Sequence, residues 1–97
     1  MEINMKQYNE VAEILKALAH PVRLCIVRGL IEKDGCNVCH MQECLGLPQS
    51  TTSQHLQKLR TAGIIVGKRK GLEVTYQVSN QRVVQLIDLL FSEKKEI

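Results

Sequence analysis

The sequence predicts a mainly α-helical domain that carries one β-hairpin, with the element order α-α-α-α-β-β-α. Three observations predict this fold class. Apolar residues recur with a helical period over most of the 97 residues, and the period shortens to two only across residues 64–78. Glycine or proline stands between the periodic segments, where helices and strands usually end. One hydrophobic core suits this length, so we expect residues 1–97 to form a single domain with a frayed tail at residues 92–97.

The first two helices are predicted on either side of Pro21. Apolar side chains recur at helical spacing from Val11 to Leu18, which predicts an amphipathic helix over residues 5–19. Proline suits the first turn of a helix, so the second helix is expected to begin at Pro21. Its apolar stripe continues until a turn that contains Gly35, which is a plausible helix stop.

The third and fourth helices are predicted to be separated by a tight turn. The apolar residues Val38, Met41 and Leu45 indicate a short third helix. The fourth helix is expected to have Pro48 near its first position and to end at Gly63. Its buried face should consist of Thr52, Leu56 and Leu59.

A two-stranded hairpin is predicted where the period is two. The first strand covers Ile64–Lys68, and the turn Arg69-Lys70-Gly71 joins it to a second strand over residues 72–78. The second strand should place four apolar side chains on one side: Leu72, Val74, Tyr76 and Val78. Because the predicted turn contains Arg69 and Lys70, the hairpin should have a basic tip.

The last helix is expected to follow a cap at Ser79 or Asn80. Its apolar positions are Val83, Val84, Leu86, Ile87, Leu90 and Phe91. This is more apolar surface than one face of a small domain needs, and so small a core is marginal in a lone chain. We therefore expect part of this helix to be buried against a second subunit. The alternative is a terminal helix that docks wholly on its own domain.

The basic residues are concentrated in one third of the chain. The net charge is +3, and no acidic residue occurs between Glu43 and Glu73. That interval contains five bases: Lys58, Arg60, Lys68, Arg69 and Lys70. Such a block is typical of a surface that binds phosphates, and the alternative is a solvated basic surface.

The third helix, the turn and the fourth helix form a predicted helix-turn-helix, and the basic hairpin forms a wing. The fourth helix begins with the short polar run PQSTTSQH. Glutamine can pair with adenine edges, and serine or threonine, such as Thr51, can bond to bases or phosphates. Lys58 and Arg60 would then meet backbone phosphates. The wing would reach phosphates or an adjacent minor groove through Lys68, Arg69 and Lys70.

Two stretches carry a family resemblance, LKALAHPVRLCIV at residues 15–27 and LGLPQSTTSQHLQKLRTAGIIVGKRKGLEVTYQVS at residues 45–79. They resemble the ArsR/SmtB family of bacterial repressors, and the similarity extends from about residue 10 to residue 91. The resemblance implies a winged-helix homodimer with its first and last helices in the interface. It also implies binding to an imperfect palindromic operator in double-stranded DNA, with release when an inducer binds.

The resemblance also implies which residues face the DNA groove: Gln49, Ser50, Ser53 and Gln54. His55 belongs to the same motif, and a helix-packing role is the alternative for it. The zinc site that some relatives carry on the last helix looks absent, because residues 80–91 contain Asp88 and no histidine. The C-terminal cysteine of some persulfide-sensing relatives is also missing, because Ser92 follows Phe91.

Four cysteines remain as candidates for sensing the inducer: Cys36, Cys39, Cys44 and Cys25. Relatives that sense arsenic, cadmium or lead carry a Cys-Val-Cys-Asp motif on the third helix. Cys39 aligns with its second cysteine, Asn37 stands in place of the first, and His40 replaces the acid. The metal motif is therefore altered here.

The spacing of the cysteines favours a thiol switch. Cys36 and Cys39 are close enough to form a short-loop disulfide or to share a metal ion. Cys39 is expected near the start of the third helix, where the helix dipole favours a thiolate. We interpret the pair as a disulfide or persulfide switch that needs no cofactor. The alternative is a site for arsenite, cadmium or another thiophilic metal, and Cys44 and Cys25 could instead be small core residues.

Two other classes of protein, thiol oxidoreductases and structural zinc modules, fit the sequence less well. A Cys-x-x-Cys motif in a thiol oxidoreductase follows a strand of a βαβ unit, and no strand is predicted before Cys36. No Ser/His/Asp set or phosphate loop is visible, so we expect no enzyme. A structural zinc module would use Cys36, Cys39, His40 and Cys44, and helical spacing argues against it.

The composition predicts a cytoplasmic protein. No apolar run approaches the length of a membrane span. The N-terminal run MEINMKQYNE contains acids and no hydrophobic stretch, so we expect no secretory signal and no membrane partner. In a reducing compartment, cysteines act as ligands, sensors or core residues more often than as structural disulfides.

Overall fold

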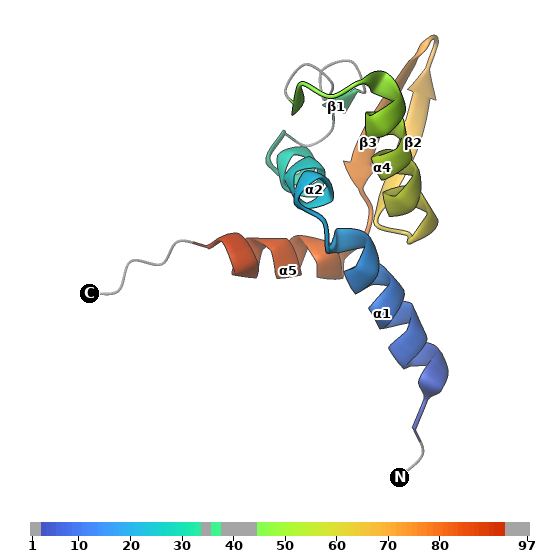
Figure 1. Cartoon of the computed structure of the whole chain (residues 1–97), viewed down its shortest axis with the longest axis vertical. Coiled ribbons are helices and arrows are strands. Elements are labelled where there is room, and N and C mark those ends of the chain that lie inside the picture. Colours follow the sequence, from blue (N-terminus) through green and yellow to red (C-terminus); the bar gives the residue numbers. More distant parts are fainter. Residues whose placement is uncertain (1–2, 34–35, 38–44, 93–97) are drawn as a thin grey trace, which may run out of the picture.

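The computed structural model describes residues 3–33, 36–37 and 45–92. Its elements are α1 (Met5–Leu18), α2 (Pro21–Lys33), β1 (Cys36–Asn37), α4 (Gln49–Thr61), β2 (Ile65–Lys70), β3 (Glu73–Val78) and α5 (Gln81–Phe91). In Figure 1, α2, α4 and the sheet form the body, α1 projects from one end, and the tip of the wing lies at the other. The predicted third helix falls mainly on residues 38–44, which lie outside the described residues.

The core is aliphatic and draws side chains from all four described helices and from the start of the wing. Its buried members are Ala17, Leu18, Ile26, Val27, Leu30, Leu56, Leu59, Ile64, Ile65, Val83 and Ile87. The predicted buried face of α4 is confirmed, because Thr52, Leu56 and Leu59 are at most 2% exposed. The packing of this face fixes how α4 lies on the body, and hence which side of α4 meets solvent.

The sheet has three strands, with the order β1-β3-β2. The predicted two-stranded hairpin is confirmed as β2 and β3. The prediction missed a third strand, because β1 pairs antiparallel with β3 through Cys36↔Tyr76 and Asn37↔Thr75. A strand of two residues shows no period of its own, and its partner lies far along the sequence. The extra strand joins the segment before the helix-turn-helix directly to the wing.

The wing is longer than predicted, because β2 continues to the pair Lys70↔Glu73. The prediction that Arg69 and Lys70 lie in the turn was therefore wrong, and the loop consists of Gly71 and Leu72. Gly71 has φ of 60°, which suits the first position of a two-residue hairpin loop. Leu72 lies at the tip and is 99% exposed, so it does not share the inner side of the strand as expected.

Apolar side chains remain exposed on α1 and α5. Leu89 and Leu90 of α5 are 72% and 64% exposed, and Met5, Tyr8 and Leu15 of α1 are 59%, 62% and 49% exposed. The alternative in which the last helix docks wholly on its own domain was therefore wrong for the end of α5. None of the described helices combines the length and the apolar composition of a membrane span.

The start of α5 is fixed by Asn80, as one of the two predicted caps. Its side-chain oxygen accepts hydrogen bonds from the backbone N–H groups of Arg82 at 3.0 Å and Val83 at 3.4 Å. We expect Asn80→Ala to lower the free energy of unfolding by about 1 kcal/mol, because these two donors lose their partner. Urea denaturation checks this expectation. Asn80→Asp keeps a side-chain oxygen at the cap and serves as the matched control, and an equal loss in both variants would contradict the assignment of the cap.

Candidate nucleic-acid interface

One side of α4 presents a row of polar side chains to solvent. Gln49, Ser50, Ser53 and Gln54 are exposed, and Thr51 is half-buried. The opposite side of the helix is buried in the core, so the orientation of the polar row is set by packing. Amide and hydroxyl groups can donate and accept hydrogen bonds at base edges in a major groove.

The first turn of α4 has no competing negative charge. Pro48 occupies the N-cap and offers no side-chain hydrogen bond to the free N–H groups of the first turn. The hydroxyl of the buried Thr52 donates to the carbonyl oxygen of Pro48 at 3.2 Å, and this hydrogen bond stabilises the first turn of α4. Because no acidic residue lies in the first turn, the positive end of the helix dipole is open to an anion.

The five bases of the acid-free interval all lie at the surface. Lys58 and Arg60 follow the polar row on α4, and Lys68, Arg69 and Lys70 lie along β2. None of them forms an ion pair within the part of the chain that the structure describes. Their charges are therefore available to phosphates, although exposed cations are individually weak ligands and act together.

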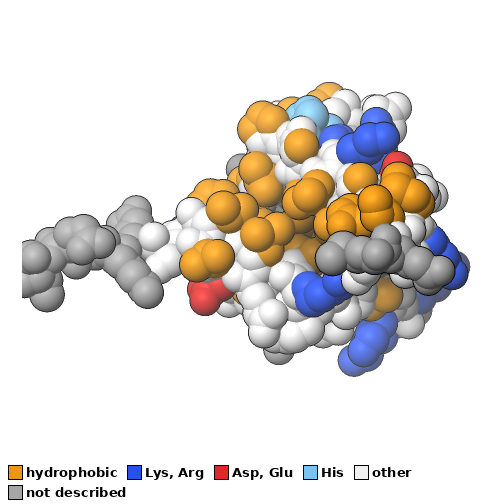
Figure 2. Space-filling view, turned by 90° about the horizontal axis from the view of Figure 1, so that it is seen from below, with side chains coloured by type: hydrophobic (Ala, Val, Ile, Leu, Met, Phe, Trp, Pro, Cys, Tyr) orange, Lys and Arg blue, Asp and Glu red, His pale blue; other side chains and the backbone are white. Residues whose placement is uncertain are grey.

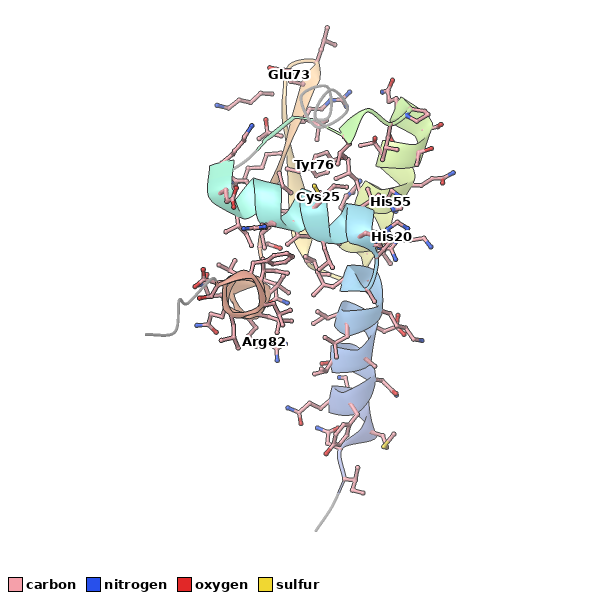
Figure 3. All side chains as sticks on the ribbon, turned by 60° about the vertical axis from the view of Figure 1, so that its left-hand side comes forward. His20, Cys25, His55, Glu73, Tyr76 and Arg82 are labelled. Atoms are coloured by element: carbon pink, nitrogen blue, oxygen red, sulfur yellow. The ribbon has the colours of Figure 1, made fainter. Side chains whose placement is uncertain are left out.

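A polar joint that the sequence analysis did not identify holds α4 against the ends of α1 and α2. It consists of Arg23, His20 and His55, and Figure 3 shows the two rings side by side where α2 begins. Arg23 is only 9% exposed. Its Nε donates to the carbonyl oxygen of Ala17 at 2.6 Å, and its Nη1 lies 3.2 Å from Nδ1 of His55. The ring centroids of His20 and His55 are 4.6 Å apart.

Burial lowers the pKa of His55 below the usual value of 6.5, and the nearby His20, Arg23 and Lys58 lower this pKa further. These contacts favour the packing role that was the alternative for His55. The signal for Arg23 in the sequence was weak, because a single base in an amphipathic helix usually lies at its surface.

The structure describes the side chain of one of the four candidate thiols. Cys25 is exposed, so the interpretation of Cys25 as a small core residue was wrong. It lines a groove of about 500 Å³ between α2 and α5, together with Leu24, Arg28 and Phe91. The guanidinium carbon of Arg28 lies 4.4 Å from the centroid of the Phe91 ring.

Of the other three candidate thiols, only the backbone of Cys36 is described. Cys36 belongs to β1, where its backbone is paired with Tyr76. Cys39, His40 and Cys44 lie outside the described residues. Among the described residues, no three His, Cys, Asp or Glu side chains are grouped so that they could hold a metal ion.

Comparisons with known proteins agree with this geometry. Residues 18–67 match a family model described as a helix-turn-helix domain. The chain is 42% identical over 89 residues to the transcriptional repressor PagR of Bacillus anthracis, covering 92% of this chain and 89% of PagR. The crystal structure of PagR aligns with a TM-score of 0.82 at 41% identity, over 90% of this chain and 99% of PagR.

Two further solved structures are similar. Reduced HlyU from Vibrio cholerae aligns with a TM-score of 0.83 at 30% identity, over 92% of this chain and 96% of HlyU. Mb0332 from Mycobacterium bovis aligns with a TM-score of 0.82 at 28% identity, over 89% of this chain and 79% of that chain. The latter is a homodimeric winged helix-turn-helix DNA-binding domain of a possible ArsR-family transcriptional regulator.

Proposed function

Because this chain belongs to the ArsR/SmtB family of winged helix-turn-helix transcriptional repressors, we propose that it binds an imperfect palindromic operator as a dimer. The observation that carries the proposal is the two-sided construction of α4, with polar residues exposed on one side and core residues buried on the other. α4 enters the major groove, and the basic β2 strand lies along the adjacent backbone. The protein acts in the cytoplasm.

The dimer is proposed to form through α1 and α5. Both helices expose apolar side chains, and Figure 2 shows such side chains gathered on the face at the end where α1 projects. A shallow groove between the helices is lined mainly by apolar residues, among them Val11, Leu15 and Leu86. To reach two successive major grooves, the dimer must hold its two copies of α4 about 34–36 Å apart, which is one turn of the DNA helix.

Fluorescence anisotropy tests the proposal directly. The reduced, metal-free protein is titrated onto DNA from upstream of its own coding sequence, with a scrambled duplex as control. We expect tight binding to the upstream DNA, weakening steeply as salt is raised because phosphate contacts release counterions. Sedimentation equilibrium should give a dimer. Equal affinity for both duplexes, or a monomer that still binds specifically, would overturn the proposal.

We further propose that thiol chemistry at Cys36 and Cys39 lowers operator affinity. The supporting observation is that β1 is paired with β3 at Cys36↔Tyr76, so a bond at Cys36 would act directly on the wing. Loss of two thiol protons and two electrons to an added oxidant would join the sulfur atoms. The second candidate is a thiophilic metal held by the same cysteines, which the altered spacing of the metal motif disfavours.

The double substitution Cys36→Ser/Cys39→Ser is expected to leave operator binding of the reduced protein unchanged and to abolish the response to oxidant. In the wild type, diamide should lower the affinity at least about tenfold, and dithiothreitol should restore it. Anisotropy before and after each addition measures both effects.

Cys25→Ser is the matched control, because Cys25 is an exposed thiol on α2 and does not belong to β1, the strand through which the switch is proposed to act. A double variant that still responds fully to diamide would exclude the Cys36/Cys39 site. A wild type that responds to cadmium or arsenite but not to diamide would favour the metal alternative.

A further inference from the structure

We propose that Arg23, His20 and His55 form a pH-sensitive joint that positions α4, so that protonation of His55 weakens specific binding to the operator. The inference rests on the proposed function, in which α4 reads the DNA. His55 is the residue directly after Gln54 of the polar row, and it is half-buried against the start of α2. A change in its packing therefore acts on the reading surface itself.

The hydrogen bonds of the joint require a neutral His55. A guanidinium can only donate, so the 3.2 Å contact between Arg23 Nη1 and His55 Nδ1 needs an acceptor at Nδ1. The proton of neutral His55 must then be on Nε2. Protonation would add a second N–H at Nδ1 and turn the contact into two facing donors, with two positive charges at the same distance. The contact between α2 and α4 would be lost.

His20 contacts the His55 ring from the start of α2. Its Nδ1 accepts the backbone N–H of Val22 at 3.1 Å, and its carbonyl oxygen accepts the N–H of Leu24 at 2.9 Å. His20 thus begins α2 while its ring lies against His55. The joint therefore links the start of α2 to the middle of α4 through two imidazoles that both act as acceptors.

The charged groups around His55 oppose its protonation. Arg23 faces it from α2, His20 from the residues between α1 and α2, and Lys58 from the next turn of α4. In the groove beside the joint, α1 contributes Lys16 and Glu13, which pair with each other at 3.5 Å. No carboxylate within the described residues forms an ion pair with Arg23 or His55. The described part of the chain therefore supplies the joint with no counterion that would stabilise a second positive charge.

The direction of the pH effect distinguishes this joint from general electrostatics. Added positive charge normally strengthens binding to DNA, because it increases the attraction to phosphates. The joint predicts the opposite result for specific binding. The pKa of His55 in the folded protein is lowered from its usual value of 6.5. The stabilisation that the neutral joint provides is therefore complete above that usual pKa and is lost as pH falls through the lower pKa of the folded protein.

Operator affinity measured as a function of pH at constant ionic strength tests the inference. As pH is lowered from about 8, we expect the wild-type affinity to be retained down to the usual histidine value of 6.5 and to be lost progressively below it, because the pKa of His55 is lowered. His55→Gln should bind like the wild type at the higher pH, because the amide oxygen can accept from Arg23, and it should lose the decrease. His40→Gln is the matched control for the remaining histidine outside the joint and should keep the decrease.

A retained decrease in His55→Gln would overturn the inference. NMR titration of the histidine ring protons in the free wild-type protein provides a test that needs neither the variant nor DNA. The His55 resonance should titrate below the usual histidine range, with a midpoint that matches the loss of affinity, and a His55 that titrates normally would overturn the joint. Absence of specific binding at the higher pH would instead be a failure of the proposed function, and the NMR result would still decide on the joint.

Discussion

Replacing Ser50 and Gln54 together by alanine is expected to weaken operator binding at least about 100-fold, because each lost base contact costs about 1–3 kcal/mol. The two residues lie one turn apart on the exposed side of α4, so both face the same stretch of groove. In a dimer the loss occurs in each half-site. The fold should not change, because alanine favours a helix and neither side chain belongs to the core.

Gln57→Ala provides the control within the same helix. Gln57 is also exposed, but it lines the groove between α4 and α1, together with Glu13 and Lys16. We expect its affinity to stay within about threefold of the wild type, as for a residue that makes no base contact. Anisotropy on operator and scrambled DNA measures both variants. The assignment of the reading surface fails if Gln57→Ala loses as much specific affinity as the double variant.

The sequence was sufficient for the two sides of α4, because the pattern that separates them lies within one helix. Thr52, Leu56 and Leu59 recur on one side, and the polar residues occupy the other, so the period of the pattern predicts both the buried face and the exposed row. The same reasoning predicted α1, α2 and α5 within a few residues. It also predicted the exposed bases, because a block of bases without acids is rarely buried.

The sequence was not sufficient where a residue's position depends on a distant partner. β1 has two residues, and only its pairing with β3 makes it a strand. Leu72 follows the apolar alternation but lies in the loop, because the ladder continues to Lys70↔Glu73. Local pattern therefore missed the connection between the cysteine segment and the wing, on which the proposed thiol switch depends.

The joint at His55 shows the same limit for the candidate site. Arg23 and His55 are 3.2 Å apart in space but belong to different helices, and no spacing rule brings them together. The motif suggested a DNA contact or a packing role for His55, and only the contact with Arg23 favours the second. The exposed polar row of α4 was thus predictable from one helix, whereas the contacts of Arg23 and His20 with this helix were not.

Leu59→Ala is expected to lower the free energy of unfolding by about 2–5 kcal/mol, the usual cost of truncating a fully buried leucine. Leu59 of α4 is 0% exposed and belongs to the core cluster to which α1, α2, α5 and the start of the wing also contribute. A cavity there removes contacts that hold α4 in place. Native domains are stable by only about 5–15 kcal/mol, so this single change removes a large share of the total.

Thermal and urea denaturation at one fixed protomer concentration measure the effect, because dimer stability depends on concentration. For a domain of this size, Tm should fall by at least about 10 °C. Leu72→Ala makes the same chemical change at the tip of the wing, where the side chain is 99% exposed, and should change stability by less than about 0.5 kcal/mol. Similar losses in the two variants would mean that the inner face of α4 does not hold the recognition helix on the body. In that case the exposed polar row of α4 would have no fixed orientation toward DNA.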